Sequence, residues 1–191
     1  MSRALIVVDV QNDFCEGGSL AVQGGGDVAR SISEMLGTDR AGGTYDVVVA
    51  TKDWHVDPGV HFADPEVGPN YVDTWPVHCV AQTEGAAFHA DLEVAVDEVF
   101  LKGRRTASYT GFDGGASADE SVLLGEWLRA RGVTEVDVVG LATDHCVRAT
   151  ALDARNAGFA TRVLLDHCAG VAPETTEAAL AEMTGAGITL A

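Results

Sequence analysis

Short apolar runs that read as β-strands alternate with longer helical patterns, and this alternation constrains the fold more than any other feature. Six such runs, the last of them short, lie at residues 4–10, 45–53, 95–103, 135–142, 161–167 and 187–190. Helical patterns lie at residues 26–37, 118–131, 144–157 and 174–185, and Gly132 and Gly158 stand where helices are expected to end. Strands that are apolar on both faces are typical of a parallel sheet covered by helices on each side. We therefore predict an α/β fold with three layers, α/β/α, around a mostly parallel central sheet.

The length and the apolar content fit one domain. The chain has 191 residues, of which 47% are hydrophobic, and this is enough to fill a single core of that size. We find no repeat or linker, so we expect a single domain over residues 1–191. Residues 1–8 run straight into Asp9 and read as a first strand rather than as a signal peptide.

The charge balance argues against two classes of partner. A formal net charge of -17 repels the phosphates of nucleic acids and anionic lipid surfaces. No apolar run approaches the roughly 20 residues of a membrane-spanning helix. We expect neither nucleic acid nor a membrane as a partner. The scattered cysteines form no CxxC pair, which favours reduced thiols in a cytoplasmic protein over disulfides; they are Cys15, Cys79, Cys146 and Cys168.

Polar side chains follow four of the predicted strands at the point where each strand ends. Asp9 ends the first run, Asp53 and His55 follow the second, Lys102 the third, and Cys146 comes after the fourth. In an open parallel sheet, binding sites form just beyond the carboxyl ends of the strands. We therefore expect these side chains to meet at one rim of the sheet.

A stretch without clear periodicity, residues 54–92, holds four of the six histidines and two of the three tryptophans. A loop of this length inside a compact domain is usually functional. Asp53, His55 and His61 form the pattern D-x-H-x5-H, and His78 supplies a third imidazole. One carboxylate and three imidazoles can bind a divalent cation such as zinc, iron(II) or manganese. Each histidine alone is equally consistent with a packed side chain, and His89 lies outside the pattern.

Cys146 follows Thr143, an expected helix N-cap, by three residues. The positive end of a helix favours a thiolate, a neighbouring Lys102 would lower the thiol pKa further, and Asp9 could carry the proton. Free cysteine is also among the most buried residue types, and we expect that role for the other three cysteines. Asp9 alone could cap a turn, and Lys102 alone could be a surface charge. Together the three residues supply the nucleophile, the proton carrier and the cation of a site for acyl transfer.

Five motifs carry a family resemblance: "ALIVVDVQNDFCEGGSLAV", "ATKDWHVDPGVHF", "WPVHCV", "FLKG" and "GLATDHCVRATALDARNAG". They resemble the bacterial nicotinamidase/pyrazinamidase branch of the isochorismatase-like cysteine hydrolases over essentially the whole chain. The combination of D-x-H-x5-H with WPxHC is specific to the metal-containing amidases of that superfamily.

The resemblance implies roles for individual positions. It implies a catalytic triad of Asp9, Lys102 and Cys146, and a single divalent metal ion held by Asp53, His55, His61 and His78. It also implies that the substrate carbonyl oxygen is held by the backbone N–H groups of Ala142 and Cys146, beside a cis peptide between Leu141 and Ala142. The implied walls of a flat aromatic pocket are Phe14, Leu20, Trp75, Tyr109, Leu141 and His145.

The activity implied by the resemblance is hydrolysis of nicotinamide to nicotinate and ammonia in NAD salvage, through a thioester on Cys146. Pyrazinamide, converted to pyrazinoate, is an expected second substrate. The metal would position the substrate ring rather than generate hydroxide. A cytoplasmic monomer or small homo-oligomer is expected.

Two departures from the family pattern bear on the pocket: a longer loop at residues 62–74, and Arg105 where an aromatic residue can occur. Two alternatives stay open. One is another hydrolase of the superfamily, an isochorismatase or an N-carbamoyl amidohydrolase, although those enzymes generally lack the full metal set. The other is a non-catalytic protein that binds a metal or senses oxidation through its thiols.

Overall fold

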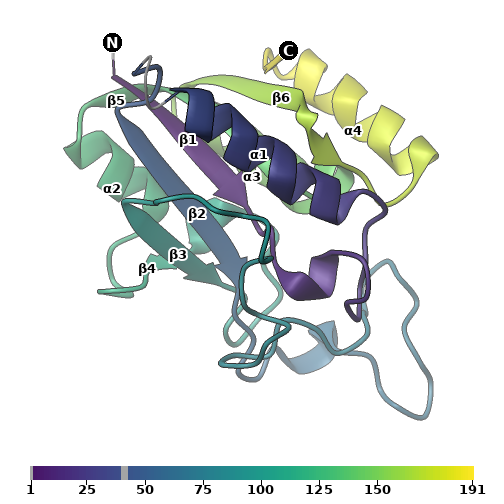
Figure 1. The fold of residues 1–191 in the computed structure, drawn as a ribbon. Coiled ribbons are helices and arrows are strands. Elements are labelled where there is room, and N and C mark those ends of the chain that lie inside the picture. Colours follow the sequence, from purple (N-terminus) through teal and green to yellow (C-terminus); the bar gives the residue numbers. More distant parts are fainter. Residues whose placement is uncertain (1, 40–42) are drawn as a thin grey trace.

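A seven-stranded sheet forms the centre of the molecule, with helices on both faces (Figure 1). The computed structural model describes residues 2–39 and 43–191. The strand order is β4-β3-β2-β1-β5-β6-β7, and all neighbours are parallel except β3 and β4. The strands are β1 Ser2–Val8, β2 Val47–Asp53, β3 Glu98–Lys102, β4 Gly115–Ala116, β5 Val133–Leu141, β6 Ala160–Ala169 and β7 Thr189–Leu190. The helices are α1 Gly25–Asp39, α2 Leu124–Ala130, α3 Arg148–Asn156 and α4 Pro173–Gly185.

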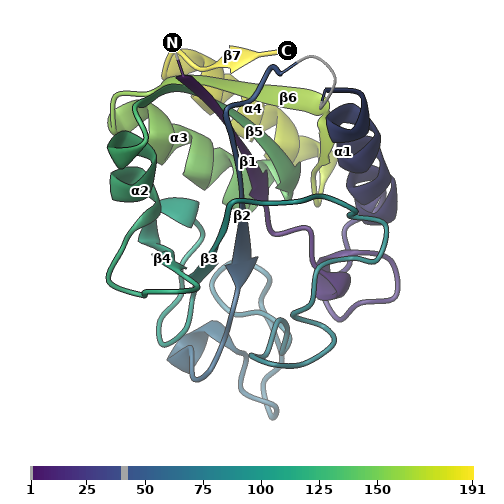
Figure 2. The same cartoon turned by 60° about the vertical axis from the view of Figure 1, so that its left-hand side comes forward.

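The side chains of β1 point alternately into two separate cores. Ile6 packs in the same core as Trp127 of α2, Ala151 of α3 and Met183 of α4. Leu5 and its neighbours on the other face pack with α1 and with the segment before β3. Figure 2 shows α1 on one side of the sheet and α2 and α3 on the other. The central strands are apolar on both faces because both faces are covered, and the predicted three-layer α/β/α architecture is confirmed.

The predicted strands and helices all have counterparts in the structure, with one clear error of boundary. Residues 118–123 were expected to open a helix, but α2 begins only at Leu124. The preceding residues form a turn instead, because Ala116 donates its N–H to Val122 O at 2.9 Å and the Asp119 carboxylate accepts from the Ser121 N–H and hydroxyl. The short strand β4, antiparallel to β3, was not predicted.

Residues 54–92 are irregular, as expected, apart from one short helical turn at Gly59–His61. Isolated bridges hold the segment together, one between His55 and Val80 and another between Phe62 and Trp75. The segment lies beyond the carboxyl ends of the strands (Figure 1). Among the helices of the described residues, none has the length and apolar character needed to cross a bilayer.

Candidate active site

Four buried polar side chains meet at the carboxyl ends of adjacent strands. Asp9 directly follows β1, and its backbone takes a φ of 49°. Asp53 ends β2 and is paired in register with Lys102, which ends β3. Cys146 lies in the five-residue turn Thr143–Val147 that follows β5. The convergence expected from the strand ends is therefore present, and all four residues are buried.

Lys102 lies at the centre of this group. Its Nζ is 2.9 Å from Asp9 Oδ2, 2.5 Å from Asp53 Oδ1 and 3.6 Å from Cys146 Sγ. Nζ also donates to the Ser108 carbonyl oxygen at 3.2 Å. Burial alone would lower the pKa of Lys102, but Asp53 and Asp9 outweigh burial and raise the pKa well above its usual value. The side chain is therefore a fixed ammonium between two carboxylates and the thiol.

Asp9 has a different polar partner at each carboxylate oxygen. The Thr51 hydroxyl donates to Oδ1 at 2.6 Å, whereas Oδ2 forms an ion pair with the Lys102 ammonium at 2.9 Å. An Asp9 carboxylate oxygen lies within 4.8 Å of Cys146 Sγ. Burial raises the pKa of Asp9; Lys102 opposes the rise and Asp53 adds to it. A carboxylate with a raised pKa beside a thiol is suited to accept a proton.

The start of the cysteine turn differs from the expected helix. Thr143 is not an N-cap: Ala142 occupies that position without a side-chain cap. The turn is a π-helix, in which both the His145 N–H and the Val147 N–H donate to Ala142 O, at 3.0 and 3.1 Å. A turn widened in this way needs tertiary contacts to form, and single-turn π-helices are frequent at functional sites.

Burial raises the pKa of the Cys146 thiol well above its usual value, against the lowering effect of Lys102 that was expected from the sequence. Burial likewise raises the pKa of Cys15 and of Cys168 to about 12, and that of Cys79 above its usual value. The pKa of the thiol therefore does not distinguish Cys146 from the core cysteines. Its polar neighbours and its position in the wall of a pocket do.

Three imidazoles form a compact buried cluster beside Asp53. His55 Nδ1 lies 2.6 Å from Gly103 O, and His78 Nδ1 lies 2.7 Å from Pro76 O. Because a carbonyl oxygen only accepts, both Nδ1 atoms carry the proton, and in the neutral form of each ring the Nε2 atom is the one that can bind a metal. These Nε2 atoms are 3.3 Å apart and lie 3.6 and 3.8 Å from Asp53 Oδ2.

His61 completes the cluster, and one ring nitrogen of each histidine lies within 4.8 Å of the others. Its Nδ1 is buried without a hydrogen-bond partner among the described residues. Burial and the two neighbouring histidines lower the pKa of His61 to about 4, so its ring is neutral near pH 7. Lone pairs that converge beside a carboxylate fit a divalent cation, and a packed core would leave them unpaired. The donor set of Asp53, His55, His61 and His78 therefore fits the expected metal.

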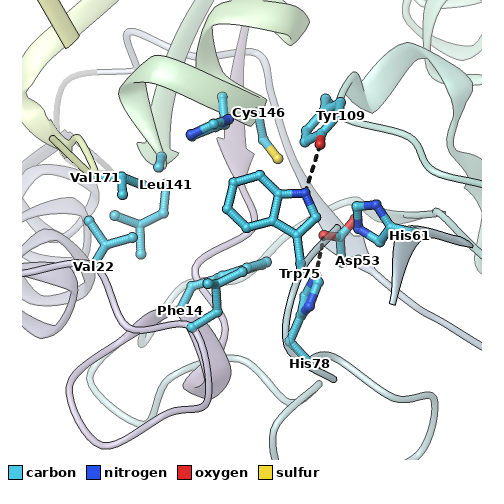
Figure 3. A pocket seen from close by; sticks show the side chains of 13 residues that line it. Phe14, Val22, Asp53, His61, Trp75, His78, Tyr109, Leu141, Cys146 and Val171 are labelled. Carbon is cyan, nitrogen blue, oxygen red and sulfur yellow. Dashed lines mark hydrogen bonds and ion pairs between the residues drawn. The ribbon is translucent and has the colours of Figure 1, made fainter. Parts of the chain in front are cut away.

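A pocket of about 440 Å³, open to solvent, lies between the cysteine turn and the histidine cluster. Figure 3 shows the Cys146 sulfur directed into it and Asp53, His61 and His78 together on another side. Trp75 Nε1 donates to the Tyr109 hydroxyl at 2.9 Å, which joins two of its aromatic walls. All six expected wall residues line it: Phe14, Leu20, Trp75, Tyr109, Leu141 and His145.

Two wall residues, Val22 and Val171, were missed from the sequence. Val171 follows the end of β6 by two residues, so the strand-end argument could have found it. Val22 lies two positions after Leu20 in the same loop. Arg105 is exposed and does not line the pocket. No residue of the longer loop lines the pocket either, but Phe62 bridges to Trp75, and the Tyr71 ring lies edge-on to Trp75 at 6.2 Å.

The turn after β5 also carries the expected cis peptide between Leu141 and Ala142. Gly140 directly precedes it with a φ of 118°, and a Cβ at this position would lie 2.1 Å from Val8 O. Only glycine permits this close approach of β5 to β1, and the approach brings the Cys146 turn next to Asp9.

Comparisons with known proteins agree with this geometry. The isochorismatase domain family matches residues 3–191. The nicotinamidase/pyrazinamidase of Mycobacterium tuberculosis is 56% identical over 190 residues, covering 98% of this chain and 97% of the relative. The crystal structure of Pyrococcus horikoshii pyrazinamidase in complex with zinc has 39% identity and a TM-score of 0.83, covering 100% and 99% of the two chains. A structure from L. infantum in complex with nicotinate has 34% identity and a TM-score of 0.83, covering 100% and 92%.

Proposed function

The chain belongs to the isochorismatase family, and from this premise we propose that it hydrolyses nicotinamide to nicotinate and ammonia and pyrazinamide to pyrazinoate and ammonia. One observation carries the proposal. Cys146 Sγ lies 3.6 Å from the Lys102 ammonium and beside Asp9, and it lines a pocket that His61 and His78 of the histidine cluster also line. A flat aromatic amide with a ring nitrogen matches the nucleophile on one side and the histidine cluster on the other.

In the first half-reaction, Cys146 Sγ transfers its proton to Asp9 Oδ2 and attacks the amide carbon. The raised pKa of Asp9 and the closeness of its carboxylate to the thiol suit this transfer. The backbone N–H groups of Ala142 and Cys146 hold the carbonyl oxygen as negative charge develops on it. Asp9 then protonates the amide nitrogen, the C–N bond breaks, ammonia leaves, and a thioester remains on Cys146.

In the second half-reaction, Asp9 takes a proton from a water molecule, and the resulting hydroxide attacks the thioester carbon. The C–S bond breaks, the thiol regains the proton from Asp9, and the carboxylic acid product leaves. Lys102 acts in both half-reactions by stabilising the thiolate whenever it forms. This explains why a permanently charged ammonium lies against a thiol that is neutral at rest.

A divalent metal ion would be held by Asp53, His55, His61 and His78. When bound, it would supply a positive anchor for the ring nitrogen of the substrate. Zinc fits this donor set, as do iron(II) and manganese.

The aromatic walls of the pocket hold the substrate ring. Phe14 and Trp75 stack on the ring, and Tyr109 holds Trp75 in place by accepting its N–H.

The remaining features of the proposal concern its setting. The four cysteines are free, as in proteins of a reducing compartment, and we infer a cytoplasmic enzyme of NAD salvage with one domain over residues 1–191, acting as a monomer or small homo-oligomer. The other hydrolases of the superfamily are not favoured, because the histidine cluster would have no role in them.

An ammonia assay over a small panel tests the function. Nicotinamide and pyrazinamide should release ammonia, whereas isochorismate should not be cleaved and an N-carbamoyl amine should release little. Removing the metal with a chelator should abolish turnover, and adding back zinc, iron(II) or manganese should restore it. Activity on isochorismate or the N-carbamoyl compound without activity on nicotinamide would refute the proposal. No turnover of any compound by metal-loaded protein would favour the non-catalytic alternative.

A further inference from the structure

Asp144 is a buried carboxylate that the proposed chemistry does not use. It lies in the π-turn Thr143–Val147, two residues before Cys146, and its side chain is 0% exposed. No Lys or Arg forms an ion pair with it in the part of the chain that the structure describes. The basic residue nearest to it in sequence is His145, whose Nε2 lies 4.0 Å from Asp144 Oδ2. Burial lowers the pKa of His145, so this ring is neutral near pH 7.

The hydrogen-bond donors to Asp144 lie in the first turn of α4 and in the two residues before it. Oδ1 accepts from the Val171 N–H at 2.9 Å, and Oδ2 accepts from the Ala172 N–H at 3.3 Å and from the Thr175 hydroxyl at 2.5 Å. The N-cap position of α4 is Ala172, which has no side-chain acceptor. Asp144 therefore binds the segment that leads into α4 and the Thr175 hydroxyl of its first turn, from a different element of the fold.

These hydrogen bonds keep the carboxylate ionised. Burial by itself would raise the pKa of Asp144, but the Thr175 hydroxyl and the Val171 N–H outweigh burial and lower the pKa below its usual value. A charged acceptor makes stronger hydrogen bonds than a neutral one, and it also interacts favourably with the positive end of a helix. The link between the π-turn and α4 therefore depends on the charge as well as on the shape of the side chain.

The two segments that Asp144 joins form two walls of the active-site pocket. His145 and Cys146 line it from the π-turn, and Val171 lines it from the segment between β6 and α4. Val171 is 51% exposed, so packing alone holds it weakly. Figure 3 shows Val171 beside Leu141 on the wall away from Asp53 and His61. The hydrogen bond from the Val171 N–H to Asp144 Oδ1 ties Val171 to the turn of the nucleophile.

We propose that Asp144 is a positioning residue for substrate binding, which fixes the Val171 wall at a set distance from the Cys146 turn. The inference rests on the proposed function, because the ring of the amide is what the two walls enclose. Asp144 touches no reacting atom. Its loss should therefore weaken binding of the ring more than it slows the chemical steps, and a residue that merely stabilised the fold would not separate the two.

Steady-state kinetics with nicotinamide test this separation. Asp144→Asn keeps the shape and removes the charge, and it should raise KM about tenfold while kcat stays within about threefold of wild type. Thr175→Val removes one donor and should raise KM about threefold, whereas Thr175→Ser keeps the hydroxyl and should behave as wild type. Glu174→Gln removes an exposed charge from the same helical turn and is the matched control. An unchanged KM in Asp144→Asn and Thr175→Val, or a fall in kcat at unchanged KM, would overturn the proposal.

Hydrogen exchange at the Val171 amide provides a second, activity-independent measurement. Asp144→Asn should speed this exchange at least about tenfold relative to wild type, because the acceptor loses its charge, while Glu174→Gln should leave it unchanged. Equal exchange rates in wild type and Asp144→Asn would overturn the proposal. If Asp144→Asn fails to fold, the Thr175 pair decides the question by both measurements. If wild-type protein releases no ammonia from nicotinamide, the proposed function fails, and the exchange rates still show whether Asp144 fixes this wall.

Discussion

Asp53 contacts Lys102 through one carboxylate oxygen and faces the histidine cluster with the other. Its Oδ1 lies 2.5 Å from Lys102 Nζ, and its Oδ2 lies 3.6 Å from His55 Nε2 and 3.8 Å from His78 Nε2. The two residues end adjacent strands in register, so the sheet itself fixes this contact. A change at the histidine cluster is therefore transmitted to the ammonium beside the nucleophile through a single side chain.

The first prediction concerns the nucleophile. Cys146→Ala should lower kcat for nicotinamide at least about a thousandfold, because no other side chain in the pocket can form the thioester. Mass spectrometry of wild-type protein quenched during turnover should find a nicotinoyl adduct on Cys146. Cys168→Ala should retain most activity, since this thiol donates to the Leu164 carbonyl oxygen and does not line the pocket. An active Cys146→Ala protein would refute the mechanism.

The second prediction concerns the metal. Purified protein should contain about one divalent ion per chain, and His55→Ala or His61→Ala should lose both the ion and turnover. Elemental analysis and the ammonia assay measure the two losses, with His89→Ala as the control because it lies outside the cluster. Circular dichroism should show that the variants remain folded. Full activity of a metal-free preparation would contradict any role of the cluster in catalysis.

The third prediction separates Lys102 from Asp9. Lys102 lowers the pKa of the Cys146 thiol, so Lys102→Ala should shift labelling by iodoacetamide to higher pH, and labelling and turnover should fall together at neutral pH. Asp9 raises the pKa of the same thiol, so Asp9→Asn should not slow labelling. Turnover of Asp9→Asn should nevertheless be lost at every pH, because no group protonates the leaving nitrogen or activates water.

Two results would contradict this division of roles. One is normal turnover by Asp9→Asn. The other is an unchanged labelling profile in Lys102→Ala, which would mean that the ammonium does not stabilise the thiolate. Labelling should be measured from pH 6 to pH 10 and the site of alkylation assigned by mass spectrometry.

The fourth prediction is a pH dependence of stability in metal-free protein. Burial lowers the pKa of His61 from 6.5 to about 4. Between these values the unfolded chain binds a proton that the folded chain does not, so the stabilising contribution is present above about pH 6.5 and is lost as the pH falls towards 4. His61→Gln should show a smaller fall in Tm than wild type across this range. Equal falls in the two proteins would contradict the assignment.

Much of the site could be predicted from the sequence because it follows the ends of parallel strands. Asp9, Asp53 and Lys102 each end an apolar run, and a parallel sheet brings such ends to one edge whatever the details of packing. Val171 likewise follows the end of β6. The positions at strand ends could therefore be predicted from the number and direction of the strands.

Features that leave no local signal in the sequence could not be predicted in this way. The π-turn forms where Ala142 O accepts two N–H groups, and no local pattern distinguishes it from the start of an α-helix. The link from Asp144 to Val171 joins positions 27 residues apart. The raised pKa of Cys146 comes from complete burial, which depends on all the elements packed around it.

The order of the strands in the sheet differs from the order in which they leave the ribosome. β1 is central, but its neighbour β5 ends only at Leu141, after β2 and β3 have already been made. Throughout that interval one edge of β1 has no partner, which exposes an apolar strand to aggregation and to chaperones during synthesis. The nucleophile is translated after Asp9, Asp53 and Lys102, directly behind the strand that closes this edge. A nascent chain that ends before β5 is complete therefore carries the acidic and basic groups of the site without its thiol, and the nucleophile is added only after both neighbours of β1 have been made.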